Sequence, residues 1–298
     1  PEGTESVGMC KAGTRTCNEG VLGACEGEVL PIPEICGDTE DNNCNGIIDC
    51  GIGLEQWGSK GTDQAHDVVI DATGNAFVSG MAMASIDQQP FKGHIDVFLS
   101  KFDVNGNRLW TKMWGTAGED VGHGIALADD GSIYVCGYTS SQASNAAYRN
   151  ILLLKFGASG ELIWTKIIST MGTYQDIGWH VRLDPQGDLF VAATTVGGRM
   201  AGTTSYGGYD QILLKFDSDG NQLLARQFGT SATDAVYGLV VDQDGNAYVG
   251  GNTLGRMAGT NPSGQYDYVV TKWDNDGNRL WTSQWGTPKQ HEWGYALG

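Results

Sequence analysis

Residues 70–80 read IDATGNAFVSG, and residues 241–251 read VDQDGNAYVGG. In each stretch an apolar run leads into a turn that contains glycine, and a second apolar run follows, as in a β-hairpin. The turn glycine recurs at intervals of 57, 56 and 58 residues, at Gly74, Gly131, Gly187 and Gly245. A repeat of this length indicates an array of similar structural units.

Each unit contains four short runs of β-branched and aromatic residues, which are typical of strands. In the first unit these runs are 68–70, 76–80, 97–102 and 108–112. No helical periodicity lies between them, and four antiparallel strands in about 57 residues predict one blade of a β-propeller. The large residues that recur in the fourth run are expected to pack between blades: Trp110, Trp164, Leu224 and Trp281.

The array therefore predicts an all-β fold, a β-propeller of four-stranded antiparallel blades over residues 53–298. The expected blades are approximately 57–113, 114–167, 168–227 and 228–284, and a fifth unit starts at 285–298. Because the chain ends within an apolar run, we expect a fragment of a larger ring, and a closed four-bladed ring is the alternative. Residues 1–52 form a separate small module.

Composition and charge exclude several classes of protein. The chain of 298 residues has 35 acidic and 18 basic residues and a formal charge of -17, which argues against a nucleic-acid partner. No run of about 18 apolar residues is present, so no membrane insertion is expected. The apolar content of 40% is sufficient for a packed core.

Six of the seven cysteines lie in the module 1–52, and this density predicts a disulfide-stapled scaffold. Fifteen pairings are open among the six candidates. Disulfides need an oxidising compartment, so we expect an extracellular or cell-surface location. A zinc site is the alternative, but the module has no histidine and no C-x-x-C spacing. The disulfide candidates are Cys10, Cys17, Cys25, Cys36, Cys44 and Cys50.

The acidic run 41–49 has the pattern D-x-N-x-N-G-x-x-D, the first nine positions of an EF-hand-type calcium loop. Gly46 permits the sharp turn, whereas the glutamate of the twelfth position is replaced by Ile52. We expect a structural calcium ion here, and an Asx-rich turn without metal is the alternative. The expected ligands are Asp38, Asp41, Asn43, Asn45, Ile47 and Asp49.

At the start of each unit an acidic residue is followed three residues later by histidine or another aromatic residue. In a propeller these positions lie on the strand nearest the axis, where a ring of carboxylates could bind a cation and two histidines could share a metal. The alternative is that each acid hydrogen-bonds its inter-blade loop. The candidate channel residues are Asp63, His66, Asp120, His123, Asp176 and Asp234.

The loops after the second strand of each unit vary most, and such loops bind ligands in propellers. Two of them contain the same hexapeptide GRMAGT, at 198–203 and 255–260. Arg199 and Arg256 are scarce cations in an acidic chain and could pair with a carboxylate or sulfate group, although recent duplication explains the identity equally well. The turns 217–221 and 274–278 look like calcium loops, but their recurrence favours ordinary hairpin turns.

The repeated units resemble the SBBP-type bacterial β-propeller repeat. The likeness rests on 70–80 and 241–251 and on the pattern K-[FW]-D-x-x-G-N-x-L-W at 101–110 and 272–281, and the third unit departs from it at 184–188. Residues 31–50 resemble the Cys/Asp module of MopE-like surface proteins, which is regarded as a metal-binding motif. Both resemblances imply exported bacterial proteins, and neither implies a defined activity.

We therefore expect an exported bacterial cell-surface or secreted protein that binds or displays, with no catalysis and no organic cofactor. The sequence contains no G-x-S-x-G, H-E-x-x-H or P-loop motif. An extracellular glycan or protein is the expected ligand, and open sheet edges favour self-association. The alternatives are a purely structural scaffold and a lyase or hydrolase of extracellular polysaccharide. Such an enzyme needs paired carboxylates, and the loop acids are few: Asp87, Asp96, Asp210 and Asp267.

Overall fold

The computed structural model describes residues 7–18, 21–22, 24–32, 40–44, 46, 56–140, 148–172, 175–257, 259–260 and 266–287. The chain divides into two compact units. The first unit is Pro1–Trp57 with Asp103–Asn107, and the second is Gly58–Phe102 with Arg108–Gly298. The residues 288–298, on which most of the expected fifth repeat falls, lie outside the described part of the chain.

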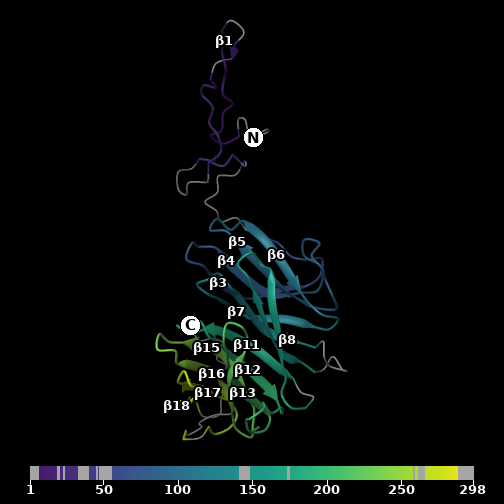
Figure 1. Cartoon of the computed structure of the whole chain (residues 1–298), viewed down its shortest axis with the longest axis vertical. Coiled ribbons are helices and arrows are strands. Elements are labelled where there is room, and N and C mark those ends of the chain that lie inside the picture. Colours follow the sequence, from purple (N-terminus) through teal and green to yellow (C-terminus); the bar gives the residue numbers. More distant parts are fainter. Residues whose placement is uncertain are drawn as a thin grey trace. The chain divides into compact units, whose positions relative to one another are not determined.

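The second unit consists of four consecutive sheets of four antiparallel strands, which we call blades 1 to 4 (Figure 1). Blade 1 contains β3 (Asp63–Ile70), β4 (Ala76–Ala82), β5 (Asp96–Phe102) and β6 (Arg108–Trp114). Blade 2 contains β7 (Asp120–Leu127), β8 (Ile133–Thr139), β9 (Asn150–Phe156) and β10 (Leu162–Ile168). Blade 3 contains β11 (Asp176–Leu183), β12 (Leu189–Val196), β13 (Tyr209–Phe216) and β14 (Gln222–Phe228). Blade 4 contains β15 (Asp234–Val241), β16 (Ala247–Thr253), β17 (Asp267–Trp273) and β18 (Arg279–Trp285).

The hydrophobic core lies between the blades. Val97 and Leu99 of blade 1 pack in one cluster with Ile125 and Val135 of blade 2, and all four side chains are fully buried. Equivalent clusters join blade 2 to blade 3 and blade 3 to blade 4. Fully burying one such side chain contributes about 1.5–3 kcal/mol to stability. The predicted all-β propeller architecture is thereby confirmed, and no helix of the described residues could cross a membrane.

The first unit contains a short hairpin of β1 (Cys17–Asn18) and β2 (Val21–Leu22). Isolated bridges at Lys11–Val29 and Thr14–Glu26 extend the pairing. A disulfide joins Cys10 to Cys44. Among the described cysteines of this unit, Cys17 and Cys25 are exposed thiols, and Cys36 and Cys50 lie outside the described residues.

In blades 1, 3 and 4 the hairpin turns are closed by an aspartate at the first position, whereas the two turns of blade 2 begin with Ala128 and Gly157. In blade 1, Asp71 Oδ1 accepts hydrogen bonds from the backbone N–H groups of Thr73 and Asn75, and the Asn75 side chain donates to Asp71 Oδ2 at 2.7 Å. The Asn75 side chain is the main reason why the pKa of Asp71 lies below its usual value. The same arrangement occurs at Asp103, Asp217, Asp242 and Asp274. These turns are satisfied by N–H donors, as hairpin turns require.

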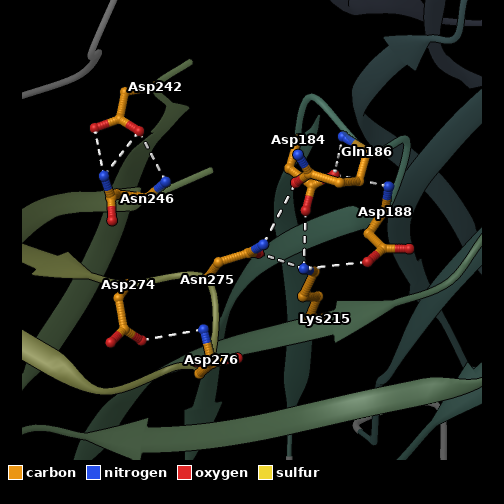
Figure 2. Close-up of polar contacts among 9 residues, drawn as sticks. All are labelled: Asp184, Gln186, Asp188, Lys215, Asp242, Asn246, Asp274, Asn275 and Asp276. Carbon is orange, nitrogen blue, oxygen red and sulfur yellow. Dashed lines mark hydrogen bonds and ion pairs between the residues drawn. The ribbon is translucent and has the colours of Figure 1, made fainter. Parts of the chain in front are cut away.

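The third unit departs from this pattern because aspartate, Asp188, replaces the donating asparagine. Here the buried Lys215 ammonium lies 2.8 Å from Asp184 Oδ2 and 3.1 Å from Asp188 Oδ2. It also donates to Asn275 Oδ1 in the β17–β18 turn of blade 4 (Figure 2). A lysine from β13 thus replaces the missing amide and connects blade 3 to blade 4.

We predict that Lys215→Met lowers the free energy of unfolding by about 3–5 kcal/mol, because the buried Asp184 carboxylate loses its cation. The matched control is Lys272→Met, which removes a more exposed lysine 3.4 Å from Asp242 and should cost below about 1 kcal/mol. Urea unfolding measures both changes. Adding Asp188→Asn to Lys215→Met should recover part of the loss, since asparagine donates to the aspartate in the other turns. Equal losses in the two lysine variants would contradict this account.

Candidate functional site

Each inner strand begins with an aspartate that caps the loop entering the blade. Asp120 Oδ2 accepts hydrogen bonds from the backbone N–H of Thr116 at 2.6 Å and from its hydroxyl at 2.7 Å. The same two bonds link Asp63 to Ser59, Asp176 to Thr170 and Asp234 to Thr230. All four acids of the candidate channel ring therefore have loop partners.

A second buried carboxylate lies beside this cap at two of the blade junctions. Asp96 of β5 and Asp120 of β7 are neighbours there, because the Asp120 N–H donates to the Ile95 carbonyl at 2.8 Å. Both side chains are fully buried, and each has an Oδ1 without a hydrogen-bond partner. Burial and the neighbouring Asp120 raise the pKa of Asp96 to about 6.

The junction of blades 3 and 4 repeats this geometry with Asp210 and Asp234. Asp210 Oδ1 and Asp234 Oδ2 lie 2.7 and 2.8 Å from the point where a β-carbon on Gly229 would sit. Any side chain at Gly229 would collide with both carboxylates. The same reason applies at Gly115, where a β-carbon would lie 2.1 Å from Asp96 Oδ1. This contact explains the glycine of the sequence Trp-Gly-Thr at 114–116 and of its counterpart Phe-Gly-Thr at 228–230.

The junction of blades 2 and 3 differs at both positions. Serine, Ser169, stands where the other copies have glycine, and asparagine, Asn150, stands where they have aspartate. The Ser169 hydroxyl donates to Asn150 Oδ1 at 2.6 Å. At this junction both the glycine and the second carboxylate are replaced, and the two replacing side chains form a hydrogen bond with each other.

In blades 1, 2 and 3 the rings that follow the capping acids form a stack. The extra residue of each inner-strand β-bulge is His66, His123, Trp179 or Tyr237. The His66 and His123 rings lie 4.9 Å apart, and the His123 and Trp179 rings 4.6 Å apart. Burial lowers the pKa of His123 to about 3, so this ring is neutral.

The candidate channel residues thus fall into two separate places, caps at the blade junctions and rings on the inner strands. His66 Nδ1 lies 2.7 Å from the Gly122 carbonyl oxygen. Within the described ranges, no group of three or more His, Cys, Asp and Glu side chains is placed to hold a metal ion. The geometry therefore brings two histidines together without assembling a wider ligand set.

The repeated hexapeptide loops are held by a glutamine of the outer strand. Gln227 Oε1 accepts the N–H of Met200 at 2.9 Å, and Gln227 Nε2 donates to the Gly198 carbonyl at 2.8 Å and to Asp210 Oδ2 at 2.7 Å. Gln284 makes the same bonds to Met257, Gly255 and Asp267. Sequence reasoning missed both glutamines, although their spacing of 57 residues was a usable signal.

The fold accounts for most positions of the hexapeptide. A β-carbon at Gly198 would lie 2.0 Å from the Thr170 hydroxyl oxygen, Met200 is buried, and Thr203 donates to Gln227. Arg199 is exposed and lies 3.3 Å from the Met171 sulfur. Arg256 is also exposed, and its Nε donates to the Thr260 carbonyl at 2.6 Å. These loops therefore present arginine from a rigid frame.

The opposite end of the blades, where the hairpin turns lie, is acidic. A hollow of about 660 Å³ there is lined by turns of blades 2, 3 and 4. Its lining includes Asp129, Asp130, Asp184, Asp217 and Asp242. An anionic ligand would be repelled by the aspartates of this hollow.

In the first unit, the expected calcium loop is described only in part. Asp41 is buried, and its Oδ2 accepts the N–H of Gly46 at 2.8 Å. Gly46 has a φ of 87°, the left-handed conformation expected for the turn. Of the other expected ligands, Asn43 is described, whereas Asp38, Asn45, Ile47 and Asp49 lie outside the described residues.

We predict that Asp96→Asn stabilises the protein at neutral pH, because it removes one of two adjacent buried carboxylates and lets an amide donate to Asp120. Because the pKa of Asp96 is raised, the contribution of Asp96 to wild-type stability is greatest below pH 4 and is lost as the pH rises through about 6. The groups that face Asp96 are Asp120 and Lys92. The variant should flatten this decline in thermal unfolding between pH 4 and pH 7. Asp129→Asn, in an exposed turn, is the control and should not.

Comparison with solved structures finds propeller proteins at low identity. A Hadza microbial sialidase, Hz136, matches 74% of this chain and 45% of its own, with a TM-score of 0.45 and 10% identity. A polysaccharide lyase, the PL25 ulvan lyase, matches with a TM-score of 0.44 and 12% identity over 73% of this chain and 54% of its own. The endo-arabinase of Bacteroides thetaiotaomicron matches with a TM-score of 0.39 and 10% identity over 77% of this chain and 83% of its own.

Among curated proteins, the regulatory protein FlaEY of Caulobacter vibrioides is 30% identical over 179 residues, which is 53% of this chain. The chain spans only 18% of the length of FlaEY. Residues 225–256 match the β-propeller repeat family named SBBP. This stretch runs from β14 through the β15–β16 hairpin, so an SBBP repeat lies at the junction of blades 3 and 4.

Proposed function

We propose that this chain is an exported bacterial binding or display protein of the cell surface or extracellular matrix, without catalytic activity. Its ligand is an extracellular glycan or protein that carries carboxylate or sulfate groups. The observation that carries this proposal is the exposed Arg199 on a loop whose glycine, methionine and threonine are all engaged in holding the loop's shape. A preorganised guanidinium loses little conformational freedom when it binds an anion.

The positions of the carboxylates favour binding over hydrolysis or elimination. A glycan lyase or hydrolase needs acid and base groups that reach the substrate. The paired acids of the described chain, Asp96 with Asp120 and Asp210 with Asp234, are fully buried at blade junctions. Among the turn acids, Asp71 and Asp217 are occupied by N–H donors. Turnover of an extracellular polysaccharide by the purified chain would replace this proposal with the enzymatic one.

Export is supported by the Cys10–Cys44 disulfide, since such bonds persist in oxidising compartments. We further propose that the module 1–52 holds a structural calcium ion. The bond from the Gly46 N–H to Asp41 supports a tight turn at the start of the expected calcium loop. Asp41, Asn43 and the remaining expected ligands would supply the oxygen atoms that calcium prefers.

The ligand prediction concerns binding to anionic polysaccharides. We expect the chain to bind immobilised sulfated or uronate-containing polysaccharides, with affinity falling as salt rises. Arg199→Ala with Arg256→Ala should weaken binding by about tenfold or more. The control Arg279→Ala removes an exposed cation of the outer strand β18 and should leave binding unchanged. Equal loss in the control would indicate nonspecific attraction, and binding that survives the double change would contradict the assignment.

The calcium prediction concerns thermal unfolding of the whole chain. Calcium added after EDTA should raise the unfolding temperature of the first unit. When the calcium concentration exceeds the Kd a hundredfold, the free energy of unfolding should increase by about 2.7 kcal/mol. Asp41→Ala with Asp49→Ala should abolish this calcium-dependent increase whatever its effect on baseline stability. An increase that survives both substitutions would move the site to Asp63, Asp120, Asp176 and Asp234. No increase at all would leave an Asx-rich turn without metal.

A further inference from the structure

Two of the blades place a lysine of their third strand against the last hairpin turn of the next blade. Lys155 of β9 donates to the Ser218 backbone carbonyl in the β13–β14 turn. Lys215 of β13 donates to the side-chain carbonyl of Asn275 in the β17–β18 turn. Ser218 and Asn275 are the second residues of the equivalent turns 217–221 and 274–278. Of these two lysines, Lys215 is therefore the one that meets a side-chain amide.

The Lys215 amine is enclosed by charged and aromatic side chains (Figure 2). Its side chain is 6% exposed, and Nζ lies 2.8 Å from Asp184 Oδ2 and 3.1 Å from Asp188 Oδ2. Nζ also lies 5.1 Å from the centre of the Phe190 ring. Asp184 and Phe190 are themselves buried. A primary amine is thus held, largely shielded from water, between one amide and two carboxylates.

The Asn275 amide presents its carbonyl to the amine. Its Oδ1 accepts from Lys215 Nζ, while its Nδ2 donates to Gln186 Oε1 at 3.4 Å. The carbonyl carbon is joined to Oδ1 by a bond of about 1.2 Å, so a small rotation of the Asn275 side chain brings this carbon into contact with Nζ. Gln186 also lines the acidic hollow, which offers a departing cation an exit.

We propose that Lys215 and Asn275 form an intramolecular isopeptide bond, a covalent cross-link between blades 3 and 4. The Lys215 ammonium passes a proton to the Asp184 carboxylate, and the neutral Nζ attacks Asn275 Cγ. The Nζ–Cγ bond forms and the Cγ–Nδ2 bond breaks. A second Nζ proton goes to the departing Nδ2, which leaves as ammonia and takes the proton from Asp184 to become ammonium. The reaction needs no oxidant, reductant or cofactor.

The surroundings favour this reaction in three ways. The low dielectric of the interior penalises both charges of the ion pair, so a neutral amine beside a neutral acid becomes accessible. A positioned acid–base group contributes about 10²–10⁴-fold in rate, and the docked blades hold the reacting groups together. The product joins residues 60 positions apart, and such a cross-link constrains the unfolded chain as a disulfide does.

The ion pairs of Lys215 described above belong to the chain before this reaction. In the cross-linked chain, the N–H of the new amide replaces the ammonium as a donor to Asp184. The cross-link goes beyond the proposed ligand binding and does not rest on it.

The test is the intact mass of the purified whole chain after reduction and denaturation. The wild type should weigh less than its sequence requires by the mass of one ammonia molecule. Protease digestion should yield a branched peptide in which the segments of Lys215 and Asn275 are joined. A wild type of full sequence mass, with both peptides linear, would overturn the proposal.

Asn275→Ser introduces the residue that stands at the equivalent position of blade 3, Ser218, so this variant should fold and have its full sequence mass. The matched control is Asn278→Ser in the same turn, because Asn278 donates to Asp274. It should keep both the mass deficit and the branched peptide. A mass deficit that survives Asn275→Ser would place the loss of ammonia at another residue and contradict the cross-link.

The role of Asp184 is tested by the rate of cross-linking in freshly synthesised chain. Asp184→Asn should slow the appearance of the branched peptide by about a hundredfold or more, because asparagine cannot carry the proton. Asp188→Asn also removes a negative charge beside Lys215 and should slow it less. Thermal unfolding shows whether both variants are folded. A folded Asp184→Asn chain that cross-links as fast as the wild type would overturn the proposed step.

Discussion

The hydrogen bonds from a threonine or serine to the first aspartate of each inner strand hold the propeller blades in sequence. A buried carboxylate must find donors within the protein, and here the backbone N–H and the hydroxyl of one residue supply them. That residue lies on the segment that passes from one sheet to the next. The bonds therefore set the path of the chain into each blade and, with it, the face that the blade presents to its neighbour.

Other features of the junction follow from the space that this cap leaves. Glycine precedes the threonine where a second carboxylate packs against its α-carbon, as at Gly229 beside Asp210. Where serine replaces glycine at Ser169, the second acid becomes Asn150 and accepts a hydrogen bond from the serine. The junction of blades 2 and 3 therefore avoids burying two adjacent carboxylates, whereas the junction of blades 3 and 4 buries such a pair. A consensus sequence of the repeats would not show this difference.

In blades 3 and 4 the hairpin-turn end carries aspartates and the loop end carries an exposed arginine, and this separation supports the proposed binding role. The turns contribute aspartates whose oxygens are largely satisfied by asparagine, lysine or backbone donors, as in the Lys215 cluster (Figure 2). The loops at the other end contribute Arg199 and Arg256. Because the same glutamine frame recurs at Gln227 and Gln284, the loop shape is repeated from blade to blade, while the exposed arginine is available to a ligand.

The sequence by itself determined the blade architecture. Alternating apolar runs and glycine turns are local signals, and a period near 57 residues repeats them, so the strands and turns at 68–112 could be placed without a structure. Only the tertiary structure decided which distant side chains meet. Asp96 beside Asp120, Lys215 beside Asn275 and His66 against His123 join residues from different strands, turns or blades, and their contacts depend on sheet register and blade packing. The candidate channel ring separated into caps and stacked rings because the aromatic residue of each inner strand is the extra residue of a β-bulge, a backbone detail that residue spacing does not encode.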